Sequence, residues 1–277
     1  MTRAALLQLN ASDDPEVNLP ITRAFLREAA EGGADFVLTP EVTNCLSSSR
    51  GRQREVLQRQ ENDITLAALR SDAKELGIWL LIGSLGLKTD DPDGRFANRS
   101  FMIDPAGDIA GWYDKIHMFD VQVSDAETYR ESDGYRPGNR AVCVPTPFGT
   151  VGMTVCYDVR FPHLHRALAQ AGATILTVPA AFSQVTGEAH WHALMRARAI
   201  ENGCYVLAPA QTGSHDTHRG QPRRTFGHSL AVAPWGEVLV DAGTEACVTF
   251  VDLDTKAVID ARRKVPSLTH DRKFDGP

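Results

Sequence analysis

The chain has 277 residues, of which 43% are hydrophobic and 23% charged, a composition typical of an ordinary globular protein. Its formal net charge of −6 argues against nucleic acid or an anionic membrane as the main partner. No segment reaches the ~18 uninterrupted apolar residues of a membrane span, so the expected partner is a small molecule. The five cysteines are scattered without a C-x-x-C pair, which is typical of free thiols, and we therefore expect a cytoplasmic protein.

Strand and helix patterns alternate along the first third of the chain. Short apolar runs predict buried strands, and stretches with apolar residues at helical spacing predict helices that end at Gly32-Gly33 and at Gly77. The expected elements are a strand at 4–9, a helix at 17–30, a strand at 36–38, a helix at 64–76 and a strand at 78–83. The charged stretch 49–60 has no clear apolar stripe and is interpreted as a solvated loop or helix edge.

Shorter connections follow, with hairpins among the helices. We expect a hairpin from 99–103 and 109–113, paired strands at 142–144 and 151–155, and a later hairpin with Pro234-Trp235-Gly236 at its tip. Helices are expected at 166–171, 189–202 and 255–263, and further strands at 174–178, 204–208 and 247–252. Paired strands with helices outside them predict an α/β protein with two sheets. No linker divides the chain, so we expect one domain over residues 1–277.

Three reactive side chains follow predicted strands, namely Glu41, Lys115 and Cys156. Because ligands in α/β folds gather beyond the carboxyl ends of strands, these side chains are expected to converge on one site. A thiol can attack a carbonyl carbon, and a carboxylate can take the thiol proton and return it to a departing amine. An ammonium can stabilise the charge on the tetrahedral oxygen. The set therefore predicts acyl transfer.

Taken singly, each residue has an ordinary structural explanation. A cysteine at a strand end most often packs as a small hydrophobic residue. Glu41 could cap a helix or meet solvent, and Lys115 could lie on the surface. Cys45 is expected to pack in a loop that roofs the site, and Cys143, Cys204 and Cys247 are expected in the core. Position alone does not decide between these interpretations.

Around the three residues the sequence resembles the nitrilase superfamily of carbon–nitrogen hydrolases. The matching segments occur in the order found in that family and span nearly the whole chain. They are Leu38-Thr39-Pro40-Glu41, Tyr113-Asp114-Lys115-Ile116-His117, Val155-Cys156-Tyr157-Asp158-Val159-Arg160-Phe161-Pro162, Ala180-Ala181-Phe182, Thr186-Gly187-Glu188-Ala189-His190-Trp191, Arg196-Ala197-Arg198-Ala199-Ile200-Glu201 and Gly227-His228-Ser229 with Pro234-Trp235-Gly236.

The resemblance implies a role for each matching residue. Cys156 would be the nucleophile, Glu41 the general base and Lys115 the stabiliser of the oxyanion. Glu131 would orient the base and the leaving amine, and the backbone N–H of Tyr157 would complete the oxyanion hole. The resemblance also implies a four-layer α-β-β-α sandwich and a homodimer or higher homo-oligomer, with the tail 265–277 packed at the oligomer interface.

Within the superfamily, the stretch 169–211 most resembles the Nit-type amidases, which act on ω-amides of α-keto dicarboxylic acids such as deaminated glutathione and α-ketoglutaramate. This resemblance implies that Arg160, Phe182 and Thr186 bind the substrate. Arg160 either holds a substrate carboxylate bidentately or pairs with an internal acid such as Asp158. His163 departs from the glutamate common at its position in this branch. The alternatives are an N-carbamoyl-amino-acid hydrolase of the same superfamily and a non-catalytic interaction scaffold.

Nine histidines raise the question of a metal site. His163 and His165, like His190 and His192, lie two residues apart on predicted helices, where side chains point about 200° apart and cannot share an ion. No H-E-x-x-H motif or Cys–His set accompanies them, and no G-x-S-x-G or G-x-G-x-x-G run is present. We therefore expect neither a metal nor a cofactor.

Overall fold

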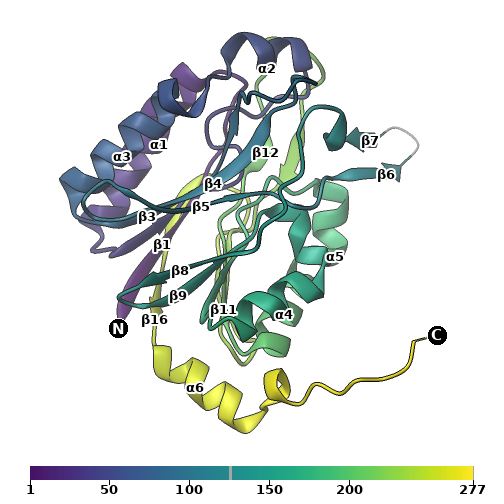
Figure 1. The fold of residues 1–277 in the computed structure, drawn as a ribbon. Helices are drawn as coiled ribbons and strands as arrows, with labels where there is room; N and C mark the ends of the chain where they lie inside the picture. The colour runs from purple at the N-terminus through teal and green to yellow at the C-terminus, as the bar shows by residue number, and fades with distance from the viewer. Residues whose placement is uncertain (125–126, 277) are drawn as a thin grey trace.

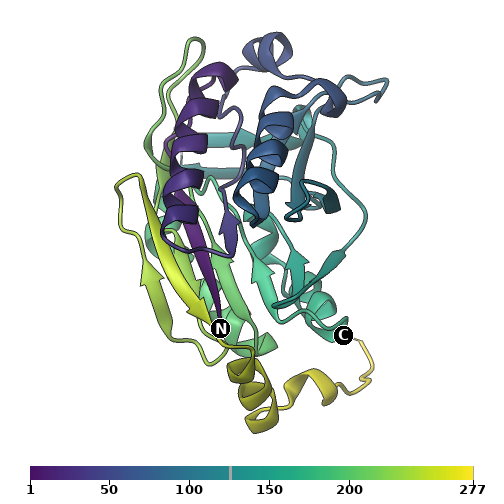
Figure 2. The same cartoon turned by 90° about the vertical axis from the view of Figure 1, so that its left-hand side faces the viewer.

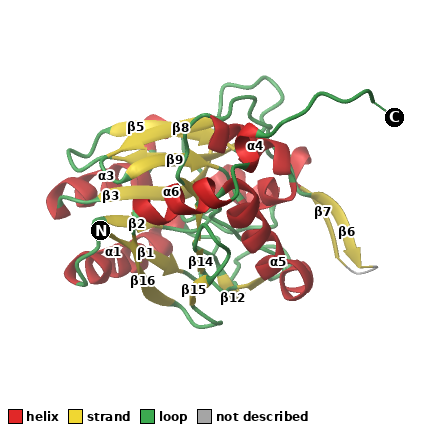
Figure 3. Ribbon diagram, turned by 90° about the horizontal axis from the view of Figure 1, so that it is seen from below, coloured by secondary structure: helices red, strands yellow, loops and turns green. Residues whose placement is uncertain are grey.

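The computed structural model describes residues 1–124 and 127–276. Two six-stranded sheets pack face to face, and helices cover their outer faces, so the layers follow the order helix, sheet, sheet, helix (Figures 1 and 3). The α-β-β-α sandwich predicted from the sequence is confirmed. Within the described ranges, no helix is both long enough and apolar enough to cross a membrane.

The first sheet has the strand order β16-β1-β2-β3-β4-β5. Its strands are β1 (Thr2–Gln8), β2 (Phe36–Leu38), β3 (Trp79–Leu87), β4 (Ala97–Ile103), β5 (Ile109–Asp114) and β16 (Cys247–Leu253). β1, β2 and β3 are parallel, whereas β4, β5 and β16 run antiparallel to their neighbours. Helices α1 (Pro15–Glu31) and α3 (Ile64–Leu76) lie side by side on its outer face (Figure 2).

Alternation along the strands decides which side chains face the helices and which face the other sheet. Leu7 of β1 packs in one buried cluster with Leu26 of α1 and Leu69 of α3. Its neighbour Leu6 belongs to the cluster that also contains Met153 of the second sheet. Since both faces of these strands are buried, they read in the sequence as continuous apolar runs.

The second sheet has the order β15-β14-β11-β10-β9-β8 and is covered by helices α4 (Pro162–Gln170) and α5 (Gln184–Asn202). Its strands are β8 (Val142–Thr146), β9 (Gly149–Met153), β10 (Ile175–Thr177), β11 (Tyr205–Ala208), β14 (Leu230–Val232) and β15 (Val238–Asp241). β9, β10 and β11 are parallel. Between the sheets, the ring of Phe36 stacks on that of Phe148 at a centroid distance of 4.9 Å.

Smaller elements surround the sandwich. They are helix α2 (Arg50–Val56), the hairpin of β6 (Asp120–Ser124) and β7 (Glu127–Arg130), the pair β12 (Thr212–Ser214) and β13 (Arg224–Phe226), helix α6 (Thr255–Lys264), and the short 3-10 helices η1 (Gln60–Asn62), η2 (Glu131–Asp133), η3 (Cys156–Arg160) and η4 (Ser267–Thr269). The charged stretch at 49–60 therefore contains a helix, and the side chain of Gln53 on it is buried. Helix α6 extends below the sandwich (Figure 1).

Two boundaries differ from the predicted ones in ways that matter for the site. β9 ends at Met153, so Cys156 begins the turn η3 rather than directly following a strand. Helix α5 begins at Gln184, five residues before the predicted start at 189. Gly187 lowers the helix propensity of this first turn, but it also leaves room for the ring of Phe226, because a Cβ at Gly187 would lie 2.3 Å from that ring. Packing thus outweighs local propensity.

Candidate active site

The ends of three strands bring Glu41, Lys115 and Cys156 together. Glu41 lies just after β2, Lys115 directly follows β5, and Cys156 lies just after β9. All three line one cavity of about 830 Å³. They are nonetheless nearly inaccessible, with 4%, 2% and 6% of their surfaces exposed. The cavity thus ends in a buried cluster of one thiol and two opposite charges.

The loop that carries Glu41 is held by an irregularity in β3. The register of β3 shifts between Ile82 and Leu85, which turns the backbone of Gly83 and Ser84 toward the loop. The N–H of Gly83 donates to the Thr39 hydroxyl at 3.0 Å, and the Ser84 hydroxyl accepts from the N–H of the residue after Glu41 at 2.8 Å. A Cβ on Gly83 would lie 2.0 Å from the carbonyl oxygen of Thr39. Only glycine permits this close approach.

The turn at Cys156 is strained and strongly supported. Cys156 has a φ of 50°, a left-handed conformation that is uncommon for a residue with a side chain. The fully buried carboxylate of Asp158 accepts from the Val155 N–H at 2.8 Å and from the Tyr113 hydroxyl at 2.7 Å. It also accepts from the backbone N–H of His117 at 3.1 Å. One carboxylate therefore ties the turn of the thiol to the segment that carries Lys115.

The ammonium of Lys115 lies between two carboxylates. Its Nζ is 2.9 Å from Oε1 of Glu41 and 2.8 and 3.0 Å from the two oxygens of Glu131. The amide nitrogen of Asn98 also contacts both acids, at 2.9 Å from Glu41 and 3.3 Å from Glu131. All four residues that the sequence predicts to be catalytic therefore lie together in one cavity. They are Glu41, Lys115, Glu131 and Cys156.

Sequence reasoning missed three donors that orient the carboxylates. Besides Asn98, the backbone N–H of Ala181 donates to Oε2 of Glu41 at 2.8 Å, and that of Phe119 donates to Oε2 of Glu131 at 2.7 Å. Asn98 is followed in β4 by the polar residues Arg99 and Ser100, so residue type alone does not single it out. Backbone donors leave no trace in residue type, because every residue except proline carries one.

Burial opposes each charge in this site, and the neighbours decide the outcome. Burial raises the pKa of the Cys156 thiol, and the Glu41 carboxylate raises it further, to well above the usual value. Burial also acts to raise the pKa of the Glu41 carboxyl, but the charges of Lys115 and Arg223 outweigh this effect, so the pKa is lowered. Burial acts to lower the pKa of Lys115, yet the charges of Glu131 and Glu41 raise this pKa well above the usual range. The resting site thus holds a neutral thiol, an ionised Glu41 and a charged Lys115.

Of the residues expected to bind substrate, Phe182 and Thr186 line the cavity, as does Tyr157. Arg160 does not belong to the lining. Its guanidinium lies 3.3 Å from the imidazole of His190 and 5.5 Å from the centre of the Phe182 ring. Over residues 1–124 and 127–276, Arg160 makes no ion pair with a carboxylate, and Asp158 is bound by other donors. The role of Arg160 stays a prediction.

Basic side chains surround the cavity. Those in its lining, besides Lys115, are Arg50, Arg130, Arg223 and Arg224. The charge of Arg223 acts to lower the pKa of both Glu41 and Cys156. Its guanidinium also donates to the carbonyl of Ala181. The adjacent pair Arg223-Arg224 was visible in the sequence but carried no motif, so it was missed.

A buried thiol beside a carboxylate base and an ammonium can carry out acyl transfer to a cysteine. The carbon–nitrogen hydrolase family model matches residues 3–263. The deaminated glutathione amidase of Yersinia enterocolitica is 40% identical over 97% of this chain and 92% of its own length. The protein of the same name from Synechocystis is 36% identical over 96% of this chain and 97% of its own. The chain belongs to the carbon–nitrogen hydrolase family, and it is an amidase.

Solved structures agree with this assignment. The NitFhit protein of C. elegans superposes with a TM-score of 0.88 and 33% identity over 98% of this chain, which spans 65% of that longer chain. Nit3 of Saccharomyces cerevisiae, a member of branch 10 of the nitrilase superfamily, gives a TM-score of 0.83 and 28% identity over 99% of this chain and 97% of its own. In an amidase from Nesterenkonia, with a TM-score of 0.77 and 26% identity over 96% of this chain and 98% of its own, the active-site cysteine carries an acrylamide adduct.

Proposed function

We propose that Cys156 is the nucleophile, Glu41 the general base and Lys115 the stabiliser of the oxyanion, aided by the backbone N–H of Tyr157. The observation that carries this proposal is the convergence of a neutral thiol with an ionised glutamate and a lysine in one buried cluster. A thiol with a raised pKa cannot attack unaided at neutral pH, and it therefore needs a base in contact. Glu41 meets this need.

The reaction follows from these protonation states. The Cys156 thiol gives its proton to Glu41 as its sulfur bonds to the amide carbon, and the carbonyl oxygen becomes an oxyanion beside Lys115. Glu41 passes the proton to the nitrogen, the carbon–nitrogen bond breaks, and ammonia or an amine departs from a thioester. Water then attacks the thioester and gives a proton to Glu41. That proton returns to the sulfur as the acid is released. Glu131 positions Lys115 and the leaving amine.

We propose that the substrate is a small carboxylated amide, the ω-amide of an α-keto acid such as deaminated glutathione or α-ketoglutaramate. Two observations support this class: the names of the relatives and the arginines around the cavity. A guanidinium binds carboxylate oxygens bidentately, and Arg223 is the better placed of these because its charge acts on both Glu41 and Cys156. Among the residues that the structure describes, its buried Nε has no hydrogen-bond partner. Arg160, outside the lining, could act only after a rearrangement.

The test is a substrate panel. The purified enzyme is assayed with α-ketoglutaramate, deaminated glutathione, an N-carbamoyl amino acid and a neutral amide without a carboxylate, and the released ammonia or amine is measured. The two ω-amides should show the highest kcat/KM. A preference for the carbamoyl compound would instead favour the alternative branch of the superfamily. A Cys156→Ala variant that turned over any of them at the native rate would remove the nucleophile assignment.

Arg223 has a test of its own. Arg223→Met keeps the apolar stem and removes the charge, which should raise KM by about 10- to 100-fold for carboxylated amides, as expected for the loss of one charge-assisted contact. KM for the neutral amide should change little. Arg219→Met, four residues earlier in an exposed pair with Glu55, is the matched control and should leave both values unchanged.

We also propose that the enzyme is a homodimer or higher homo-oligomer in the cytoplasm, formed from one domain that spans residues 1–277 with its tail 265–277 at the interface. Residue 277 lies outside the described residues. The exposed apolar side chains Ile200, Trp235 and Val265, each more than half exposed, support an interface near helix α6. The free cysteines support a reducing compartment. Light scattering on the purified protein and cell fractionation test these two statements.

A further inference from the structure

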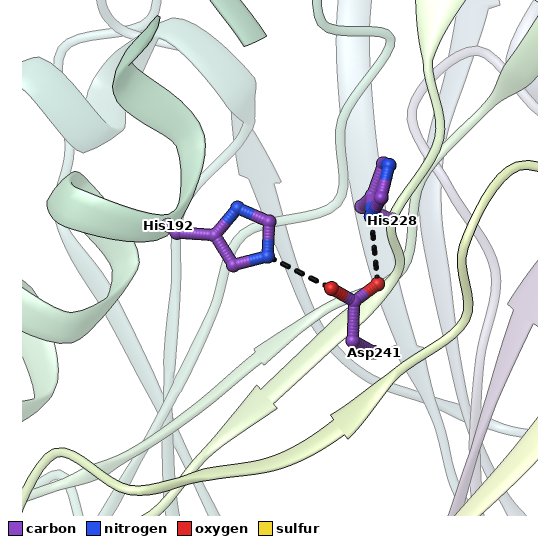
Figure 4. Close-up of side chains that lie close together, drawn as sticks. All are labelled: His192, His228 and Asp241. Atoms are coloured by element: carbon purple, nitrogen blue, oxygen red, sulfur yellow. Dashed lines mark hydrogen bonds and ion pairs between the residues drawn. The ribbon is translucent and has the colours of Figure 1, made fainter. Parts of the chain in front are cut away.

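A second cluster of chemically active side chains lies outside the catalytic cavity. It consists of His192 on α5, His228 just before β14 and Asp241 at the end of β15 (Figure 4). Nε2 of His192 is 2.8 Å from one carboxylate oxygen of Asp241, and Nδ1 of His228 is 2.8 Å from the other. None of the three residues lines the cavity of Cys156. The mechanism leaves this cluster unused.

The three groups form the donor set of a transition-metal site. Two imidazoles and one carboxylate occur together in many zinc and iron sites, because imidazole nitrogen and carboxylate oxygen both suit these ions. The three ligand atoms lie within 4.8 Å of one another. Zinc binds such atoms at about 2.1 Å, which requires separations of no more than about 4.2 Å. The three ligand atoms must therefore come within this limit for all of them to bind one ion.

The position of His228 is fixed before any ligand arrives. Its φ is 56°, and its backbone N–H donates to the carbonyl of Gly243 at 2.7 Å. Its own carbonyl accepts from the indole N–H of Trp191 at 2.8 Å, and its ring stacks on that of Phe226 at a centroid distance of 4.3 Å. Strain of this kind persists only where the surroundings enforce it, and it gathers at functional sites.

Strained positions in this chain gather at the reacting groups. Within the described residues, the non-glycine residues with positive φ are Val42, Cys156 and His228. Val42 adjoins Glu41, and Cys156 carries the thiol, so two of the three belong to the catalytic cluster. His228 is the third, and its strain has no part in that chemistry. The left-handed backbone instead aims its imidazole at Asp241 (Figure 4).

We propose that His192, His228 and Asp241 bind one divalent transition-metal cation of the zinc type, with water in the remaining position. The side chains are 40%, 25% and 33% exposed, which leaves access for the ion and for water. The ion joins α5 to the β14–β15 hairpin. Because the first turn of α5 includes the cavity residue Thr186, about 9 Å along the helix from His192, the ion also stiffens one wall of the cavity.

The sequence led us to expect no metal, because histidines two residues apart on one helix point apart and no metal-binding motif is present. His190 and His192 indeed point apart, and His190 contacts Arg160 instead. The ligands come from three elements separated by 36 and 13 residues along the chain, taken from positions 192, 228 and 241. No local spacing could indicate their meeting.

The experiment is a titration of the full-length chain, freed of metal by dialysis against a chelator, with Zn²⁺ by calorimetry and with Co²⁺ by absorption spectroscopy. We expect one ion per chain, visible d–d bands typical of nitrogen and oxygen ligands, and no sulfur-to-cobalt charge-transfer band. His192→Gln, His228→Asn and Asp241→Asn should each weaken binding by at least 10-fold. Asparagine suits position 228 because it tolerates positive φ.

His190→Gln is the matched control on the same helix, and it should bind as the native chain does. Cys156→Ala, titrated in parallel, excludes the catalytic thiol as the ligand. At a zinc concentration of 100 times Kd, the native Tm should rise by about 5 °C, and the Asp241→Asn Tm should not. Equal binding by all variants, a thiolate band, or no binding below millimolar zinc would overturn the proposal and leave Asp241 as a hydrogen-bonded link between two histidines.

Discussion

Lys115 lies between two carboxylates and beside a thiol, and its charge lowers the pKa of Glu41 and opposes the rise in the pKa of Cys156. With Lys115 charged, Glu41 stays ionised although it is buried, and it can accept a proton when substrate arrives. Glu131 matters in turn because its charge helps to keep the lysine protonated. The charges of the proposed base and the proposed oxyanion stabiliser therefore depend on each other.

This balance predicts the pH dependence of the native enzyme. Glu41 must be ionised, and its lowered pKa places the acid limb of kcat/KM below the usual glutamate range. The active form carries a neutral thiol and a charged lysine, and the raised pKa values of both keep that form intact at alkaline pH. We expect kcat/KM to be flat from about pH 6 to pH 9 for a substrate that does not titrate there.

Replacing Glu131 by glutamine should change the shape of that profile. Without this carboxylate, burial is less opposed and the pKa of Lys115 falls, so activity is lost as pH rises through the lowered value. We also expect kcat to drop about 100-fold from misplacement of Lys115. Asp133→Asn, an exposed acid in the same short helix η2, removes the same charge and should behave as native. A Glu131→Gln profile with no alkaline limb would contradict the argument.

Short irregular elements place Glu41 and Cys156, whereas Lys115 directly follows the regular strand β5. The irregularity in β3 holds the loop of Glu41, and the turn η3 holds Cys156 with its positive φ. Each is supported by buried polar contacts that link it to a neighbouring strand. The geometry of the site is therefore set by features that break the regular pattern of the sheets.

A methyl group at Gly83 should displace the loop of Glu41. In Gly83→Ala the new Cβ clashes with the carbonyl oxygen of Thr39. This oxygen belongs to the backbone and cannot turn aside as a flexible side chain could, so the loop must move. We expect kcat to fall about 100-fold, with a loss of about 1–3 kcal/mol in the free energy of unfolding. Gly111→Ala, where the Cβ meets the side chain of Val144, should cost similar stability but keep kcat. Unchanged kcat in Gly83→Ala would show that the loop does not position the base.

Removing Asp158 should destabilise the turn that carries Cys156, the proposed nucleophile. Asp158→Ala leaves the Tyr113 hydroxyl and the Val155 and His117 N–H groups without their acceptor, at a cost of about 3–5 kcal/mol in the free energy of unfolding. Tyr113→Phe removes one donor and should cost about 1.5–3 kcal/mol. Chemical denaturation measures both. A smaller loss in Asp158→Ala than in Tyr113→Phe would refute the support role of this carboxylate.

The regular elements could be predicted from sequence, and the irregular ones could not. The helix at 64–76 and the strand at 36–38 match α3 and β2, because their apolar spacing and glycine or proline boundaries are local signals. Glu41, Lys115 and Cys156 could be proposed as site residues because they follow predicted strands and match family motifs, and the structure places them in one cluster. Asn98 and Arg223 were missed because their roles arise from contacts across long sequence separations. The short strands at β12 and β13 carry no apolar pattern that could reveal them.

At the scale of the whole molecule, contacts between distant segments close the structure. β1 pairs with β16 from the other end of the chain, and the two sheets meet through residues such as Phe36 and Phe148. Asn98 of the first sheet and the segments that follow strands of both sheets line the cavity, so the active site exists only when the sandwich is complete. Helix α5 runs from this cavity at its start to the exposed Ile200 near its end. An interface at Ile200 would therefore hold the helix that forms one wall of the cavity.

Charge placed on the exposed apolar surface should separate the proposed oligomer. Trp235 is 52% exposed and lies at a hairpin tip beside Lys264 of α6, and Ile200 contacts the same hairpin at Gly236. Trp235→Glu would bury a carboxylate without a partner, which costs several kcal/mol at an interface and should convert the dimer to monomer in light scattering. KM should rise as the end of α5 loses its support. Trp112→Glu, at a tryptophan that is 43% exposed on β5, is the matched control and should leave the oligomer intact. If both variants kept the native mass, the interface would lie elsewhere, and α5 would have to be held by its own chain alone.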